Sequence, residues 1–109
     1  MEATMLVNAK IEEAGLYYNG HYRHCSLRIV LRTRGGGASI ELPVDRTEEF
    51  MEMFADELDL QNGVFVSDLK DVPVVLKTDG KNEYAGEIKA IGNILASEDA
   101  LMPLDKEEK

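Results

Sequence analysis

The fold of this chain is decided by residues 44–60, VDRTEEFMEMFADELDL. Apolar side chains recur here at spacings of three and four residues, which places them on one face of an α-helix. They are Phe50, Met53, Phe54 and Leu58. The opposite face is acidic and carries Glu48, Glu49, Glu52, Asp56 and Glu57. We therefore expect one main helix from Asp45 to Leu60, with an apolar stripe under a row of carboxylates.

Both ends of this helix carry sequence signals. Asp45 lies three residues before Glu48, which predicts a capping box in which each side chain accepts a hydrogen bond from a free backbone amide. The run Gln61-Asn62-Gly63 favours termination, because Asn and Gly adopt the left-handed conformation that closes a helix.

Three antiparallel strands are predicted before the helix. Residues 5–14 alternate apolar and polar side chains, and Asn19-Gly20 predicts a type I′ hairpin turn. A second strand follows, in which Cys25 shares an apolar face with Leu27 and Ile29, so we expect a buried core cysteine. Residues 35–37 are three glycines and predict a floppy hairpin loop before a third strand at 38–44.

Two further strands are predicted after the helix. Ser67 is expected to cap one helical turn, and Pro73 places residues 72–76 at a sheet edge or a strand start. Residues 87–95 are apolar on both faces, which is typical of a strand covered twice. We expect an α+β fold in which an antiparallel sheet of about five strands packs on one main α-helix, in the order β-β-β-α-β-β.

Length and composition limit the class of protein. With 109 residues the chain is expected to form a single domain, 1–109, with frayed ends at about 1–4 and 105–109. One cysteine cannot form an internal disulfide, and no apolar run approaches the ~20 residues of a membrane span. We therefore expect a cytoplasmic protein with no membrane partner.

The charges are unevenly distributed. The net charge is −9, which disfavours non-specific binding to nucleic acid. Residues 14–40 nevertheless contain no acid, and residues 41–71 contain ten acids against Arg46 and Lys70. The chain thus has a basic part followed by an acidic part.

Residue types that support catalysis or metal binding do not converge in the sequence. His21, His24 and Cys25 are the only cluster with metal-ligand chemistry, and along a strand His24 and Cys25 point to opposite faces. Gly35 to Gly37 lack the Lys-Ser/Thr of a phosphate-binding loop. We expect no enzymatic activity, no cofactor and no metal.

Two surfaces are candidates for binding. One is the acidic helix face, which would contact a protein partner. Its contact residues would be Glu48, Glu49, Glu52, Asp56 and Glu57. The alternative is the basic strand, residues 23–34, whose outward side chains suit phosphates or carboxylates. Its candidate anion-binding residues are His24, Arg28, Arg32 and Arg34. Each set could instead be ordinary solvated surface, or be neutralised within the chain.

The second half of the chain resembles small phage and prophage proteins. The similar parts are Val66-Ser67-Asp68-Leu69-Lys70-Asp71-Val72-Pro73-Val74 and Glu87-Ile88-Lys89-Ala90-Ile91-Gly92-Asn93-Ile94-Leu95, against a pattern of the form DLkGkpv…g.i.aIG.il.d. Asp71 stands where that family tends to have Gly, and residues 100–103 replace its aromatic ending. The resemblance implies a phage or mobile-element origin and no particular activity.

These observations give a functional expectation. We expect a small acidic protein that acts by protein–protein contact, as an inhibitor of host-defence or nucleic-acid-handling machinery, with a host or phage protein as partner. The alternatives are an anion or nucleic-acid binder and a phage structural or assembly protein, and a homo-oligomer fits the latter.

Overall fold

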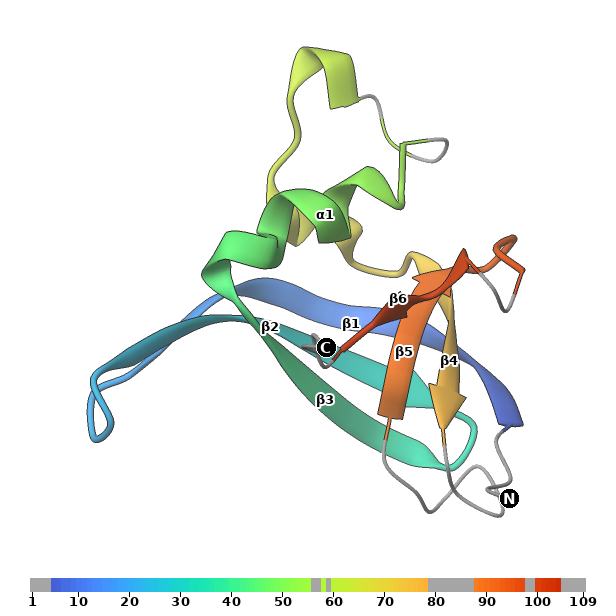
Figure 1. The fold of residues 1–109 in the computed structure, drawn as a ribbon, viewed down its shortest axis with the longest axis horizontal. Coiled ribbons are helices and arrows are strands. Elements are labelled where there is room, and N and C mark those ends of the chain that lie inside the picture. Colours follow the sequence, from blue (N-terminus) through green and yellow to red (C-terminus); the bar gives the residue numbers. More distant parts are fainter. Residues whose placement is uncertain (1–4, 56–57, 59, 79–87, 98–99, 105–109) are drawn as a thin grey trace, which may run out of the picture.

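A computed structural model describes residues 5–55, 58, 60–78, 88–97 and 100–104 of the chain. They form a six-stranded antiparallel sheet in the order β3-β2-β1-β4-β5-β6, with the short helix α1 on one face (Figure 1). The strands are β1 (Met5–Asn19), β2 (His24–Thr33), β3 (Gly36–Pro43), β4 (Pro73–Thr78), β5 (Ile88–Asn93) and β6 (Met102–Pro103). The expected antiparallel sheet is confirmed, but it has one more strand than predicted and dominates the fold.

The main helix is much shorter than the predicted range Asp45 to Leu60. Helix α1 spans Thr47–Glu52 and follows a 3₁₀ turn, η1 (Val44–Arg46). After Glu52 the backbone continues in tight turns, and residues 56, 57 and 59 lie outside the described residues. Glu48 and Glu52 repel each other at a spacing of four, and the acids that follow oppose the helix dipole. Local electrostatics therefore disfavour the long helix that the apolar period predicted.

The predicted capping box is also absent from the start of α1. Neither η1 nor α1 has a side-chain cap, and the Thr47 hydroxyl instead donates to the Val44 carbonyl at 2.7 Å. Asp45 lies inside the 3₁₀ turn, so its carboxylate is not placed at the first free amides of α1. Later in the chain, the 3₁₀ turn η3 (Val66–Leu69) is stabilised by Asp68, which accepts from the Phe65 amide at 3.0 Å, and not by the predicted Ser67 cap.

The apolar stripe of residues 44–60 does pack as predicted. Phe50 and Phe54 are fully buried and meet edge to face, with ring centroids 5.3 Å apart. They join the apolar face of β1 and β2 in the main core, while Met53 and Leu58 pack at its edge. The main core includes Ile11, Leu27, Ile29, Leu31, Leu42, Leu69, Val74, Leu76 and Ile91.

Among the described residues, the opposite sheet face is covered at one end. Val75, Ala90 and Leu101 form a small second cluster there, which confirms that β5 is apolar on both faces. Gly92 allows the close approach of this cover, because a Cβ atom at this position would lie 2.4 Å from Leu101 Cδ2. Pro73 is the first residue of β4, so the strand-start reading is right, although β4 lies inside the sheet.

Strand β1 is continuous and contains one bulge. Ile11 pairs with Leu31 and Glu13 with Val30, so Glu12 is an extra residue in β1. The buried side is carried by odd-numbered residues up to Ile11 and by Ala14 after the bulge. The bulge at Glu12 therefore moves the core-facing side chains of β1 from odd-numbered to even-numbered positions.

Both glycine-containing hairpin loops differ from their predictions. Asn19 pairs with His24, which leaves a four-residue loop, and the Asn19 side chain accepts from the His21 amide at 3.0 Å. Arg23, and not Asn19, has a positive φ of 54°. The loop expected to be floppy is a two-residue turn at 34–35, closed by Thr33, whose hydroxyl donates to the Gly36 carbonyl.

Replacing Phe50 by Ala should lower the free energy of unfolding by roughly 3–5 kcal/mol, because it leaves a cavity in the main core. Urea denaturation followed by circular dichroism measures this change. Phe65→Ala is the matched control, because Phe65 is 78% exposed, and it should change stability by no more than about 0.5 kcal/mol. Equal effects of the two variants would contradict the packing of α1 on the sheet.

Candidate binding surfaces

The hairpin between β1 and β2 extends beyond the rest of the sheet. Strand β3 pairs with β2 only as far as Ser26, opposite Pro43, and β4 pairs with β1 only as far as Lys10. The end of the hairpin is therefore a ribbon of two strands, which projects at the left of Figure 1. We call residues 16–25 the hairpin arm; nine of these ten residues are exposed, and Asn19 is half-buried.

One side of the hairpin arm continues the apolar face of the sheet. Leu16 pairs with the buried Leu27, and Tyr18 pairs with Cys25, so the three residues Leu16, Tyr18 and Cys25 lie on the core side. We call them the apolar strip. Leu16 is 67% exposed and Tyr18 is 64% exposed, because α1 and η1 cover the sheet only up to the base of the arm.

Cys25 was predicted to be buried, and this prediction is wrong. The cysteine is on the predicted face, but it is exposed. Alternation along β2 identified the side correctly, whereas burial also requires an element that covers that side. His24 is on the opposite face, and His21 contacts the ring of Tyr22 edge to face. Within the described ranges, no three His, Cys, Asp or Glu side chains are placed to hold a metal ion.

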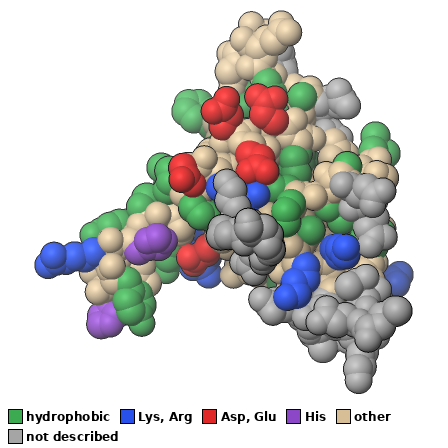
Figure 2. Space-filling view, in the orientation of Figure 1, with side chains coloured by type: hydrophobic (Ala, Val, Ile, Leu, Met, Phe, Trp, Pro, Cys, Tyr) green, Lys and Arg blue, Asp and Glu red, His purple; other side chains and the backbone are tan. Residues whose placement is uncertain are grey.

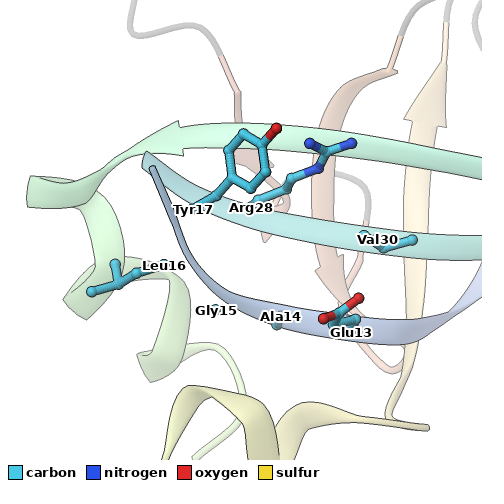
Figure 3. A pocket seen from close by; sticks show the side chains of 7 residues that line it. All are labelled: Glu13, Ala14, Gly15, Leu16, Tyr17, Arg28 and Val30. Carbon is cyan, nitrogen blue, oxygen red and sulfur yellow. The ribbon is translucent and has the colours of Figure 1, made fainter. Parts of the chain in front are cut away.

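The basic side chains of β2 are on the sheet face opposite α1. The Arg28 guanidinium lies over the ring of Tyr17, 4.5 Å from its centroid (Figure 3). Its Nη1 is 4.0 Å from a carboxylate oxygen of Glu41. In the same view Leu16 points away from this pair. Arg28 is thus held between a ring and a carboxylate of neighbouring strands.

Arg32 is also close to an acid of the sheet, because it forms an ion pair with the bulged Glu12. Arg34 is exposed in the turn before β3, and His24 is exposed at the start of β2. Three of the four predicted anion-binding residues therefore lie along β2 and Arg34 lies in the turn after it, but Arg28 and Arg32 already have carboxylate neighbours. The described acids of α1, Glu48, Glu49 and Glu52, do not neutralise them, since α1 is on the other side of the sheet.

A pocket of about 280 Å³ lies beside Arg28, on the open face of β1 and β2 (Figure 3). Its charged lining residues are Arg28 and Glu13, with Tyr17 and Val30 as further walls. The Nε of Arg28 is buried and has no hydrogen-bond partner among the described residues. Since one cation and one anion line the pocket, its charge favours neither anions nor cations.

One residue of the predicted acidic contact face, Glu49, is bound by Arg46 of the same chain. This arginine is only 5% exposed and forms two hydrogen bonds with the Glu49 carboxylate, at 3.0 and 3.2 Å. Its third donor reaches the Leu104 carbonyl at 2.9 Å, which connects the start of α1 with the end of β6. Glu49 thus has a structural role beside its predicted contact role.

Glu48 and Glu52 remain exposed on α1, without an ion pair to any residue that the structure describes. Asp56 and Glu57, the other two predicted contact residues, lie outside the described residues. Figure 2 shows hydrophobic, histidine and basic side chains on the hairpin arm, while acidic side chains gather on the body of the protein. Basic side chains also lie on the body in this view, so the charges of the two segments are not fully separated in space.

Sequence reasoning did not identify the apolar strip as a binding surface. A signal was present, because residues 16–22 combine Leu16 with three tyrosines in a stretch free of acids. Among the residues that the structure describes, no helix is both long and apolar enough to cross a membrane. Comparisons with protein-family models, with curated proteins and with solved structures found no match.

Replacing Arg46 by Ala should lower the free energy of unfolding by roughly 2–3 kcal/mol, because it removes the hydrogen bonds that Arg46 donates to the Leu104 carbonyl and to the Glu49 carboxylate. Urea denaturation measures this loss. Arg34→Ala removes the same charge from an exposed turn and should change stability by no more than about 0.5 kcal/mol. If both variants were as stable as the natural protein, Arg46 would not hold α1 to β6.

Proposed function

We propose that the protein acts without catalysis, by contact with another protein, and that the hairpin arm makes this contact. The observation that carries the proposal is the uncovered apolar strip. Tyr22, at the tip of the arm, adds another exposed ring and is 73% exposed. Exposed apolar surface on a projecting element is unfavourable in water unless a partner covers it. The strip is therefore interpreted as one side of an interface.

The composition of the hairpin arm supports this interpretation. Its ten residues include three tyrosines and one arginine and contain no Asp, Glu or Lys. Tyr and Arg are enriched in the cores of protein interfaces, whereas Lys, Glu and Asp are depleted there. Tyrosine also buries a large area while losing little conformational freedom.

A protein partner is favoured over nucleic acid by charge. Affinity for a phosphate backbone rises with the number of phosphates that cationic side chains neutralise. The hairpin arm has only Arg23 as a permanent cation, and the chain as a whole carries a net charge of −9. Arg28 and Arg32 already have Glu41 and Glu12 as neighbours, which weakens the anion-binding alternative.

The acidic face of α1 is a second candidate contact surface. Glu48 and Glu52 are exposed one helical turn apart and present two carboxylates to solvent. Such a face suits a basic partner, including one that normally binds nucleic acid. An origin in phage stays a prediction of the sequence resemblance. An inhibitory role against host defence stays a separate prediction, which the resemblance does not itself imply.

The proposal predicts that Cys25 becomes protected when a partner covers the apolar strip. Alkylation of this single cysteine by a maleimide should be rapid in dilute purified protein, because Cys25 is exposed. A partner should slow alkylation by at least about tenfold, whether it comes from a bacterial cell extract or from a higher concentration of the protein itself. Mass spectrometry of the labelled chain gives the rate.

Two variants distinguish the arm from α1 in this experiment. Tyr18→Ser combined with Tyr22→Ser should abolish the protection, whereas Glu48→Lys combined with Glu52→Lys should leave it intact. If neither the extract nor the protein itself protected Cys25, the arm would not be a contact surface. Binding to extract proteins that only the α1 variant abolished would support the acidic face instead.

A further inference from the structure

We propose that the pocket beside Arg28 binds a free α-amino acid with an apolar side chain. The carboxylate of this ligand contacts Arg28, and its ammonium group contacts Glu13. The inference goes beyond the proposed function, because it concerns the open face of the sheet and not the apolar strip. Three features of the pocket support it: a guanidinium with unused donors, a carboxylate without a partner and a strand position without a side chain.

The Arg28 guanidinium makes little use of its donors within the described part of the chain. Its Nη1 is 4.0 Å from Glu41, which exceeds hydrogen-bond distance, and its Nε is buried without a partner among the described residues. Glu41 instead accepts a hydrogen bond from the buried Ser26 hydroxyl at 3.2 Å. A guanidinium binds a carboxylate through two parallel hydrogen bonds. Stacking on Tyr17 holds the guanidinium beside the pocket, and a small turn away from Glu41 presents its unused edge to a ligand.

Glu13 supplies the opposite charge at the same pocket. It is exposed and has no hydrogen bond or ion pair to any described residue. Arg28 is opposite Gly15, two residues along β1 from Glu13, so the two charged residues are diagonal neighbours with Cα atoms roughly 7–8 Å apart. The two charges line one pocket without forming an ion pair with each other. This arrangement fits a ligand that carries both charges a short distance apart, as an α-amino acid does.

Gly15 leaves open the space beside these charges. Its φ is not in the positive range that favours glycine, and a Cβ atom at this position would meet no atom within 4 Å. Neither the backbone conformation nor the packing therefore requires a glycine, although glycine weakens a strand. Figure 3 shows Gly15 between Glu13 and Tyr17 along β1, where the missing side chain opens the floor of the pocket. A glycine inside a strand often marks a place where a ligand approaches the backbone closely.

The remaining walls favour an apolar ligand side chain. Beside the two charges, the pocket is lined by Val30 and by the ring of Tyr17, and its volume is about 280 Å³. An apolar side chain that packs on these walls is removed from water. The pocket lies on an open sheet face and encloses a ligand only partly, so we expect a dissociation constant on the order of 1 mM.

Titration of the purified chain with L-leucine, L-valine and L-phenylalanine, followed by nuclear magnetic resonance, tests the proposal. The amide signals of Glu13, Gly15 and Arg28 should shift together. Two analogues of leucine each lack one charge: 4-methylpentanoate has no ammonium group, and leucinamide has no carboxylate. Each should bind at least about tenfold more weakly than leucine, because each leaves one of the two protein charges without its contact.

Two charge variants assign the two contacts separately. Glu13→Gln should weaken the binding of leucine by about tenfold and leave that of 4-methylpentanoate within about twofold, because this analogue has no ammonium group. Arg28→Gln should weaken the binding of leucine by about tenfold and leave that of leucinamide within about twofold. Glu48→Gln is the matched control, since it removes one charge from α1 on the other side of the sheet, and it should leave all three affinities within about twofold.

Gly15→Val fills the pocket from its floor and should abolish the binding of leucine. The variant is expected to fold, because the added side chain has free space and valine is favoured in strands. Its thermal midpoint should be no lower than that of the natural chain, which circular dichroism measures. Gly37→Val makes the same change in β3, where the Cβ atom would meet only the Leu31 carbonyl at an ordinary 3.7 Å, and it should leave binding within about twofold.

Three results would overturn the inference. One is the absence of shifts with all three amino acids up to about 20 mM. Another is equal binding of leucine and 4-methylpentanoate, which would indicate an adventitious anion on Arg28. The third is binding that persists in a folded Gly15→Val variant. All of these titrations use the chain alone, so they can fail while a partner still protects Cys25, and the two proposals are tested separately.

Discussion

The packing of Phe50 and Phe54 against one face of the sheet is the interaction on which the rest of the structure depends. These two rings fill the centre of the main core and fix α1 on the side of Leu27 and Ile29. With α1 placed there, the basic row of β2 is left on the opposite face. The short helix also covers only part of its side of the sheet, so no element in the described part of the chain lies over the end of the hairpin. The exposed apolar strip is thus a consequence of where the two phenylalanines lie.

Several arginines of this protein have a carboxylate close by, and those of β2 are not neutralised by the described acids of α1. Arg28 and Arg32 have acids of adjacent strands as neighbours, and Arg46 is bound by Glu49 in its own turn. Antiparallel pairing places residues that are far apart in sequence at contact distance, which a reading of charge along the chain does not reveal. The exposed ion pairs contribute little to stability. The buried Arg46 contributes more, because it satisfies a backbone carbonyl as well as a carboxylate.

The sequence predicts this fold best where periodicity reports burial directly. The spacing of Phe50 and Phe54 placed them correctly in the core, and alternation along β2 assigned Leu27 and Ile29 to the inner face. The length of α1 could not be predicted in the same way, because repulsion between acids shortens a helix without altering its apolar period. Cys25 shows a second limit: alternation assigns a side chain to a face, but only the tertiary structure decides whether that face is covered. The hairpin arm was predicted as a hairpin but not as a binding surface for the same reason, because alternation does not reveal that its apolar side is uncovered.

The bulge at Glu12 has a consequence for how this chain can vary. Before it, odd-numbered residues of β1 face the core; Met5 to Lys10 pair with β4, and pairing with β2 begins at Ala9. After it, even-numbered residues take that side, and β1 is paired with β2 alone. The strand thus behaves as two segments with independent registers, joined inside the sheet. The distal segment is free to change its length or composition without disturbing the alignment of Met5 to Ile11 in the core. A constant scaffold with a separately variable projection is an arrangement well suited to rapid divergence of binding specificity.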